Sequence, residues 1–259
     1  MSQTDGPDAA EPRESLNAAI QGDEADIGHS TWDVGLKVTD LRKSFLSPSG
    51  DRIEVLRGAS FSASAGQTLA IMGSSGAGKS TLLHLLGGLE APDHGSVRIG
   101  EIAVDRAGAS ELARFRNHRV GFIFQFHHLL PDLTTVENVS LPLLIKRTRH
   151  DEAMRRARRM LEEVGLESRI SHLVGHLSGG EQQRVAVCRA LITQPGLVLA
   201  DEPTGNLDVA ISDEIARSLM SYARANRAVV IIATHNRALA ALCDQVLVLR
   251  DGRLTFTGG

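Results

Sequence analysis

Long apolar runs are missing from this 259-residue sequence, which has only two cysteines, Cys188 and Cys243. No stretch reaches the roughly 18 to 20 apolar residues that a membrane-crossing helix needs, and no signal-peptide pattern opens the chain. We therefore expect the protein to stay in the cytoplasm. Each cysteine lies in an apolar run without a second cysteine nearby, so we expect buried thiols rather than a disulfide or a zinc site.

Strongly basic stretches are missing as well, since the net charge of the chain is −3. Nucleic-acid-binding domains usually carry a strongly basic face, so no nucleic-acid partner is expected. Residues 1–30 hold seven acids against a single base, Arg13, and few large apolar residues. We predict a disordered acidic tail over residues 1–33 and one folded domain over residues 34–259.

Apolar residues alternate from Leu36 to Leu41 and again from Ile53 to Ser64, which predicts an N-terminal antiparallel β layer. Three short apolar runs, Thr68–Met72, Leu197–Ala200 and Ala228–Ala233, are typical of strands buried on both faces. Helical sequence comes before or after each of these runs. The pattern predicts an α/β fold with a parallel core.

Helical patterning dominates residues 125–180, which we interpret as a helical subdomain inserted into the core and broken by Pro131 and Pro142. It includes an arginine-rich helix from Asp151 to Val164, whose Glu residues favour a solvated, salt-bridged face over contact with anionic lipid. Near the C-terminus, Asp251 and Gly252 separate two strand-like halves and predict a hairpin turn.

A glycine-rich motif follows the first buried run. Residues 73–80, GSSGAGKS, fit the pattern G-x-x-x-x-G-K-[ST], in which backbone N–H groups and a helix N-terminus bind phosphates. We expect Lys79 to reach the β and γ phosphates of a nucleotide and Ser80 to offer its hydroxyl to Mg²⁺. The predicted ATP-binding residues of this loop are Gly73, Ser74, Ser75, Gly76, Ala77, Gly78, Lys79, Ser80 and Thr81.

Two carboxylates follow the run Leu197–Ala200, where a central strand leaves the core. Asp201 is suited to hold Mg²⁺, and Glu202 is suited to polarise an attacking water, which makes Glu202, with Lys79, a candidate catalytic residue. The alternative is a Glu-Pro turn with solvated acids. The two motifs together indicate a P-loop NTPase with a RecA-like core, and they leave kinases, GTPases and helicases open.

A third motif narrows this choice. Residues 177–184, LSGGEQQR, open an apolar helix in which Ser178 can cap the N-terminus while Gly179 and Gly180 expose N–H groups to a phosphate. This run, with Glu181, is similar to the signature that defines the ATPases of the ABC family. It argues against a kinase, and the absence of long coiled coils or zinc modules argues against a soluble ABC ATPase of DNA repair.

The resemblance covers residues from about 34 to 259 and implies further roles. In the family, each ATP is enclosed by the glycine-rich loop of one copy and the signature of the other. The resemblance therefore implies a head-to-tail homodimer that forms on ATP binding. It further implies that Gln125 is a Mg²⁺ ligand, that Asp208 lies at the dimer seam, that His235 is a catalytic residue and that Phe45 stacks on adenine. For Phe45, a place in the core is the alternative.

Within the family, the stretches GSSGAGKSTLLHLLGGLEAPDHG, FQFHHLLPDLTTVENVSLPLLI and LADEPTGNLD resemble ATPase subunits of lipoprotein-releasing complexes (LolD type). The resemblance implies a peripheral subunit on the cytoplasmic face of the inner membrane, bound to integral membrane subunits through residues from Gln125 to about Leu144 and without direct contact with the transported substrate. Alternatively, Phe126, Leu129 and Leu130 fill the helical core. The ATPase of a macrolide-type efflux pump or of the cell-division ABC complex is the alternative function.

Overall fold

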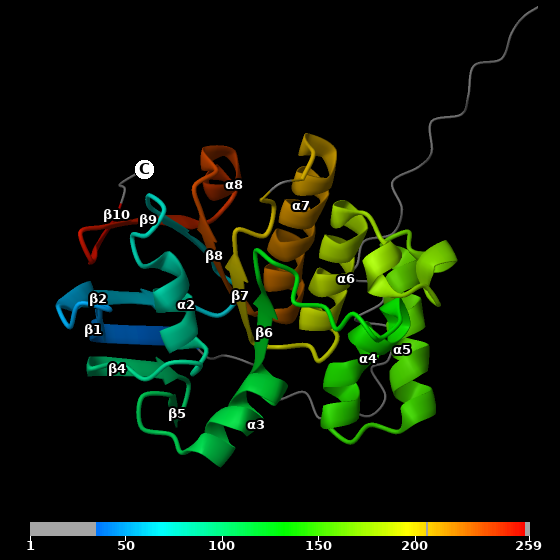
Figure 1. Cartoon of the computed structure of the whole chain (residues 1–259), viewed down its shortest axis with the longest axis horizontal. Helices are drawn as coiled ribbons and strands as arrows, with labels where there is room; N and C mark the ends of the chain where they lie inside the picture. Colours follow the sequence, from blue (N-terminus) through cyan, green and yellow to red (C-terminus); the bar gives the residue numbers. More distant parts are fainter. Residues whose placement is uncertain (1–34, 206, 257–259) are drawn as a thin grey trace, which may run out of the picture.

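Two sheets form the framework of the protein (Figure 1). The computed structural model describes residues 35–205 and 207–256, so the predicted tail at residues 1–33 lies outside the described residues. The first sheet is antiparallel and confirms the predicted N-terminal β layer. Its four strands lie in the order β2 (Arg52–Ala63), β1 (Leu36–Leu46), β4 (His94–Ile99) and β5 (Ile102–Ala103).

The second sheet has six strands and is parallel except at one edge. Its order is β10 (Arg253–Phe256), β9 (Gln245–Arg250), β3 (Thr68–Met72), β8 (Val229–Thr234), β7 (Leu197–Asp201) and β6 (Val120–Ile123). Strands β3, β7 and β8 are buried along nearly their whole length, which explains their continuous apolar sequences. The predicted parallel core is confirmed.

The parallel sheet separates two hydrophobic cores. Leu197 and Leu199 of β7 contribute to the core shared with the β layer and α2 (Lys79–Leu86), whereas Val198 and Ala200 contribute to the other core. The helices that contribute most to that second core are α4 (Thr135–Ile145), α5 (His150–Glu163), α6 (Gly179–Leu191) and α7 (Val209–Asn226). Helix α2 therefore lies on one face of the sheet, and α6 and α7 lie on the opposite face.

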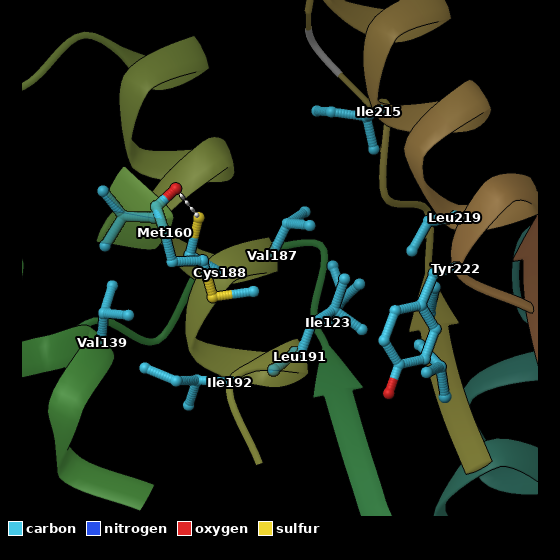
Figure 2. Close-up of a cluster of buried hydrophobic side chains, with 14 of the residues drawn as sticks. Ile123, Val139, Met160, Val187, Cys188, Leu191, Ile192, Ile215, Leu219 and Tyr222 are labelled. Atoms are coloured by element: carbon cyan, nitrogen blue, oxygen red, sulfur yellow. Dashed lines mark hydrogen bonds between the residues drawn. The ribbon is translucent and has the colours of Figure 1, made fainter. Parts of the chain in front are cut away.

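Figure 2 shows part of the second core, including Cys188 of α6 beside the carbonyl of Met160. Burial raises the pKa of the Cys188 thiol well above its usual range, and that of Cys243 to about 12. The remaining helices are α3 (Ala109–Arg119) and α8 (Arg237–Ala241), with 3-10 turns at Glu167–Arg169 and Val174–His176. Among the described residues, none of the helices has the length and apolar character needed to span a membrane.

The first helix between β6 and β7 begins later than residue 125, where the sequence predicts the helical subdomain to start. Helix α4 begins after Thr134, whose side chain and that of Glu137 form a capping box. The prediction that Pro142 interrupts the helical pattern is wrong, because α4 continues through it. Val139 and Leu143 of this helix are buried in the second core, and this packing offsets the backbone hydrogen bond that a proline cannot make.

The C-terminal hairpin forms as predicted. Asp251 and Gly252 both adopt left-handed backbone angles, with φ of 50° and 76°, between the paired strands β9 and β10. The Gly252 carbonyl accepts a hydrogen bond of 2.8 Å from the backbone N–H of Arg57 in β2. This contact joins the end of the parallel sheet to the β layer.

Candidate nucleotide-binding site

Four predicted site segments leave the parallel sheet at the same edge. Residues 73–78 follow β3, His235 follows β8, Glu202 follows β7, and Gln125 lies beyond the end of β6. These strands are neighbours in the order β3, β8, β7 and β6, and all of them are parallel. Their carboxyl ends therefore meet at one edge, which is where open α/β sheets bind ligands.

Backbone angles and close contacts explain why the loop between β3 and α2 has glycine at three positions. Gly76 and Gly78 adopt φ angles of 77° and 101°, which other residues rarely adopt. A Cβ atom on Gly73 would lie 2.6 Å from the carbonyl oxygen of Leu249. Gly78 precedes α2 without any side-chain cap, so the first N–H groups of the helix remain available to an anion.

Lys79 is buried although it is charged, and its ammonium group is held by the loop itself. Its Nζ donates to the carbonyl oxygens of Gly73 at 2.9 Å and Ser74 at 3.1 Å, and lies 3.9 Å from Oε1 of Glu202. The hydroxyl-bearing residue Ser80 is exposed beside it. Lys79 is thus located where a phosphate bound by the loop would meet its charge.

Three other residues of the predicted loop set are accessible to different degrees. Ser74 and Ser75 are exposed, whereas Thr81 is half-buried in the first turn of α2. Ala77 closes the loop by donating from its backbone N–H to the Ser74 carbonyl at 3.2 Å. The loop therefore keeps a defined shape while its serines face outward.

Glu202 is fixed by both its backbone and its side chain. It adopts a left-handed φ of 45°, and its N–H donates to the Ala233 carbonyl at 2.8 Å. The carboxylate accepts from Thr234 Oγ1 at 3.1 Å and pairs with His235 Nδ1 at 2.9 Å. Its side chain is only 11% exposed, which excludes the alternative of solvated acids. Left-handed non-glycine residues of this kind occur most often at functional sites.

Asp201 occupies the last position of β7 and is half-buried, directly before the fixed Glu202. The imidazole of His235 is largely exposed, so one ring nitrogen meets Glu202 while the ring remains open to solvent. Asn236 caps α8 by accepting from the N–H groups of Ala238 and Leu239. The short amide of Asn236 therefore fills the N-cap position of α8.

The start of α6 is a pre-formed capping box. Ser178 Oγ accepts from the Glu181 N–H at 3.3 Å, and the Glu181 carboxylate accepts from the Ser178 N–H at 2.7 Å. Arg169 Nε also donates to this carboxylate at 3.0 Å. Hydrogen bonds from the Ser178 backbone and from Arg169 lower the pKa of Glu181 from 4.5 to about 2. The predicted N-cap role of Ser178 is confirmed.

The low pKa of Glu181 leads to a prediction about acid stability. Since the folded-state value lies below the usual 4.5, the charged carboxylate stabilises the fold fully above pH 4.5 and loses this effect as the pH falls toward 2. Glu181→Gln should lower the free energy of unfolding by about 1–2 kcal/mol at pH 7. Urea unfolding of both proteins from pH 7 to pH 3 would measure the difference, and a difference independent of pH would contradict the assignment.

The two signature glycines have different surroundings. A Cβ on Gly179 would meet no atom within 4 Å, whereas a Cβ on Gly180 would lie 2.5 Å from Cδ1 of Ile211 in α7. A larger residue at position 180 would therefore displace only the flexible end of the Ile211 side chain. The space beside Gly179 is open in this chain, which leaves room for a molecule outside it to approach the helix start.

Gln125 is exposed at the start of a loop that runs to Thr134. Two polar side chains hold this loop, the half-buried Arg189 and the buried Asn138. The guanidinium of Arg189 in α6 donates to the carbonyls of His127 and His128, both at 2.7 Å. Burial lowers the pKa of Arg189.

Asn138 holds the other end of the loop. Its side chain is fully buried, accepts from the Leu130 N–H at 2.8 Å and donates to the Leu130 carbonyl at 3.0 Å. With the loop fixed at both ends, Phe126 remains 73% exposed and Leu130 43% exposed. The alternative that these residues fill the helical core applies only to Leu129, which packs against the second core.

Asp208 is the N-cap residue of α7. Its Oδ1 accepts from the Ile211 N–H at 2.9 Å and caps α7. The exposed Val209 follows it. Asn206, which belongs to the same predicted seam segment, lies outside the described residues.

Phe45 lies near the end of β1, next to Ile53 of β2, and is 39% exposed. This exposure excludes the alternative of a core phenylalanine. The ammonium of Lys43 lies 5.1 Å from the centroid of its ring. Strand β1 packs into the same hydrophobic core as α2, on one face of the parallel sheet.

The structure brings together the loop, Lys79, Glu202 and His235, but it separates them from the signature. Helix α6 is connected to β7 by residues 192–196 alone, so it runs against the strand direction and its first residues lie toward the carboxyl edge. A contact from Gln183 of α6 to the Pro203 carbonyl, at 2.7 Å, agrees with this orientation. The two anion-binding helix starts thus share an edge but lie on opposite faces of the sheet.

A parallel sheet that carries this loop, the Asp201–Glu202 pair and a separate LSGGE helix start defines an ATPase of the ATP-binding cassette class. The chain belongs to the ABC transporter family, whose sequence profile matches residues 56–205. It is 50% identical over 220 residues to the "Lipoprotein-releasing system ATP-binding protein LolD" of Geobacter metallireducens, covering 85% of this chain and 97% of that protein. The protein of the same name from Syntrophotalea carbinolica is 47% identical over 220 residues, covering 85% and 96% respectively.

Two solved structures share the fold, each with a TM-score of 0.80 and 34% identity, covering 85% of this chain and 96% of theirs. One is the dimeric structure of MJ0796, a bacterial ABC transporter cassette. The other is a dimeric post-hydrolysis state of the ATP-binding cassette MJ0796 bound to ADP and Pi. The predicted ABC family and the fold class are therefore confirmed.

Proposed function

We propose that the protein powers a lipoprotein-releasing transporter, and that two copies associate head to tail around two ATP molecules. The dimer is proposed because the starts of α2 and α6, the two candidate phosphate-binding helix starts, share an edge of the sheet but lie on its opposite faces. One nucleotide cannot contact both starts within a single copy. A second copy, turned head to tail, would bring its Ser178 and Gly179 to the phosphates held by the first.

In this arrangement Lys79 compensates the charge of the β and γ phosphates, and Glu202 orients the attacking water. The pairing of Glu202 with His235 and Thr234 supports this role, because it fixes the carboxylate before any substrate arrives. Asp208 would lie at the seam between copies. ATP favours the closed dimer to the extent that it binds the closed state more tightly than the open one.

The residues proposed for Mg²⁺ offer oxygen donors only: the hydroxyl of Ser80, the carboxylate of Asp201 and the amide of Gln125. Hard cations of this kind prefer such ligands and are usually held by one or two carboxylates together with phosphate oxygens, so the set fits Mg²⁺. When bound, the ion would neutralise charge on the phosphates. Ser80 and Asp201 orient it from the loop and from the end of β7.

Phe45 is proposed to stack on adenine, and its exposed ring supports this role. We expect Phe45→Ala to raise the Kd for ATP about 5-fold to 150-fold, because stacking on an aromatic ring contributes about 1–3 kcal/mol per base. Phe45→Tyr should retain wild-type affinity. Titration calorimetry with ATP and with tripolyphosphate tests the idea: equal weakening of both ligands would show that the ring acts on the loop instead.

The loop from Gln125 to Thr134 and the start of α4 are proposed to contact the integral membrane subunits. Exposed Phe126 and Leu130, on a loop fixed by Arg189 and Asn138, offer an apolar surface that is already ordered. The protein would then act peripherally at the cytoplasmic face of the inner membrane, without touching the transported lipoprotein.

Affinity purification of this protein from native membranes tests the proposal. We expect integral subunits of a lipoprotein-releasing complex to co-purify, and Phe126→Asp with Leu130→Asp to weaken their recovery at least about 10-fold. The matched control is the pair Leu46→Asp and Phe256→Asp, which adds charge at exposed apolar residues elsewhere. Recovery of the membrane subunits of a different exporter would refute the lipoprotein assignment.

A further inference from the structure

A buried glutamine connects the signature helix to the catalytic turn. Gln183 of α6 is 2% exposed, and its Nε2 donates to the carbonyl of Pro203 at 2.7 Å. Pro203 is also buried, directly after Glu202. A buried backbone carbonyl needs a donor, and this one receives it from another element of the fold.

The Pro203 carbonyl belongs to a tight turn that determines the direction of Glu202. The Gly205 N–H closes the turn by donating to the Glu202 carbonyl at 3.0 Å. At its other side, the Glu202 N–H is bonded to the Ala233 carbonyl of β8 at 2.8 Å. The turn is thus held by the sheet on one side and by Gln183 on the other.

Helix α6 is well suited to transmit a displacement to this turn. Its first residues form the capping box of Ser178, and Gln183 lies about one helical turn further along the same helix. Arg184 Nη1 also donates to Glu214 of α7 at 3.2 Å, so α6 and α7 are joined beside the turn. A shift of the helix start therefore reaches Pro203 through a rigid element.

We propose that Gln183 is a positioning residue for ATP hydrolysis. By holding the Pro203 carbonyl, it links the helix start that caps the nucleotide of the second copy to the turn that directs Glu202 at the nucleotide of its own copy. This inference rests on the proposed function, since it requires that Glu202 orients the water. Through this link, the position of Glu202 in one copy depends on whether the Ser178 helix start of the same copy has bound the nucleotide of the other copy.

A comparable bond elsewhere in the protein gives a matched control. Tyr222 of α7 is fully buried and donates from its hydroxyl to the carbonyl of Pro195 at 2.9 Å. Figure 2 shows Tyr222 within the second core. Pro195 precedes β7, so this bond lies at the opposite edge of the sheet from Glu202. Both bonds satisfy a proline carbonyl, and only the bond of Gln183 reaches the catalytic turn.

The first experiment compares Gln183→Met with Tyr222→Phe in the full-length protein. Both should lower the melting temperature, because each leaves a buried carbonyl without its donor. Gln183→Met should lower kcat for ATP about 10-fold or more with KM unchanged, whereas Tyr222→Phe should change neither. If Gln183→Met does not fold, Gln183→Asn, whose amide is one methylene shorter, replaces it. A folded variant at Gln183 with the wild-type kcat would overturn the proposal.

The second experiment combines the substitution with Glu202→Gln in single-turnover reactions. If Gln183 acts through Glu202, adding Gln183→Met to Glu202→Gln should slow the residual hydrolysis less than about twofold. Additive losses would assign Gln183 a general structural role and reject the inference. Normal turnover by Glu202→Gln alone would instead reject the proposed role of Glu202, so the two failures are distinguishable.

Discussion

Replacing Glu202 by glutamine is expected to slow ATP hydrolysis about 100-fold to 10,000-fold while ATP binding is preserved. The amide has the shape of the carboxylate and can still accept the hydrogen bond from Thr234, so the turn should keep its conformation. It cannot polarise water as a base. With ATP uncleaved, the contacts that hold two copies together persist, and the dimer should accumulate.

Steady-state ATPase assays and light scattering after size exclusion measure both effects of Glu202→Gln. The matched control is Glu111→Gln, which changes an exposed carboxylate in the first turn of α3. It should leave the variant monomeric after ATP is consumed, as in the wild type. A Glu202→Gln protein that stays monomeric in saturating ATP, alone and with its membrane partners, would contradict the proposed head-to-tail dimer around two ATP molecules.

Gly179→Val is expected to lower ATPase activity about 100-fold with little loss of stability, because a Cβ atom at this position would lie in open space. In the proposed dimer, however, it would occupy the space through which the second copy's phosphates approach. Gly180→Ala is the comparison at the neighbouring position. Its Cβ would displace Cδ1 of Ile211, the flexible end of that side chain, and should lower the free energy of unfolding by no more than about 1 kcal/mol.

Denaturant unfolding and ATPase assays of both glycine variants separate these effects. Mixed dimers add a stronger control. If a Gly179→Val copy is combined with a Lys79→Ala copy, one composite site carries both defects and the other carries none. Such mixtures should recover activity that neither variant has alone. An absence of recovery in verified mixed dimers would show that loop and signature do not serve each other in trans.

Short, local patterns explain which parts of the fold could be predicted. The bounds of β3 and the hairpin at Asp251 agree with the prediction because each is decided by a few adjacent residues. The start of α4 was missed although the Thr134 and Glu137 spacing of its capping box is visible in the sequence. The burial of Asn138 under the preceding loop is different, because no local pattern shows that the loop folds over it.

The residues of the site also fall into those that local spacing predicts and those that it does not. The glycine loop and the Asp201–Glu202 pair follow from spacing alone, whereas Gln183 and Arg189 were missed because their partners are 20 and 61 or more residues away in sequence. A polar residue within an apolar helix is the one signal that could have pointed to them. Such a residue indicates an unknown buried partner, and only the folded chain shows which carbonyl it meets.

The capping box at Ser178 has a consequence for how quickly two copies can associate. Its hydrogen bonds and the Arg169 contact are complete in an isolated copy, so no segment at this surface has to become ordered when the copies meet. Recognition then resembles the docking of two rigid bodies, and its speed should follow encounter frequency and local concentration. Holding both copies beneath one membrane complex would make that encounter nearly unimolecular.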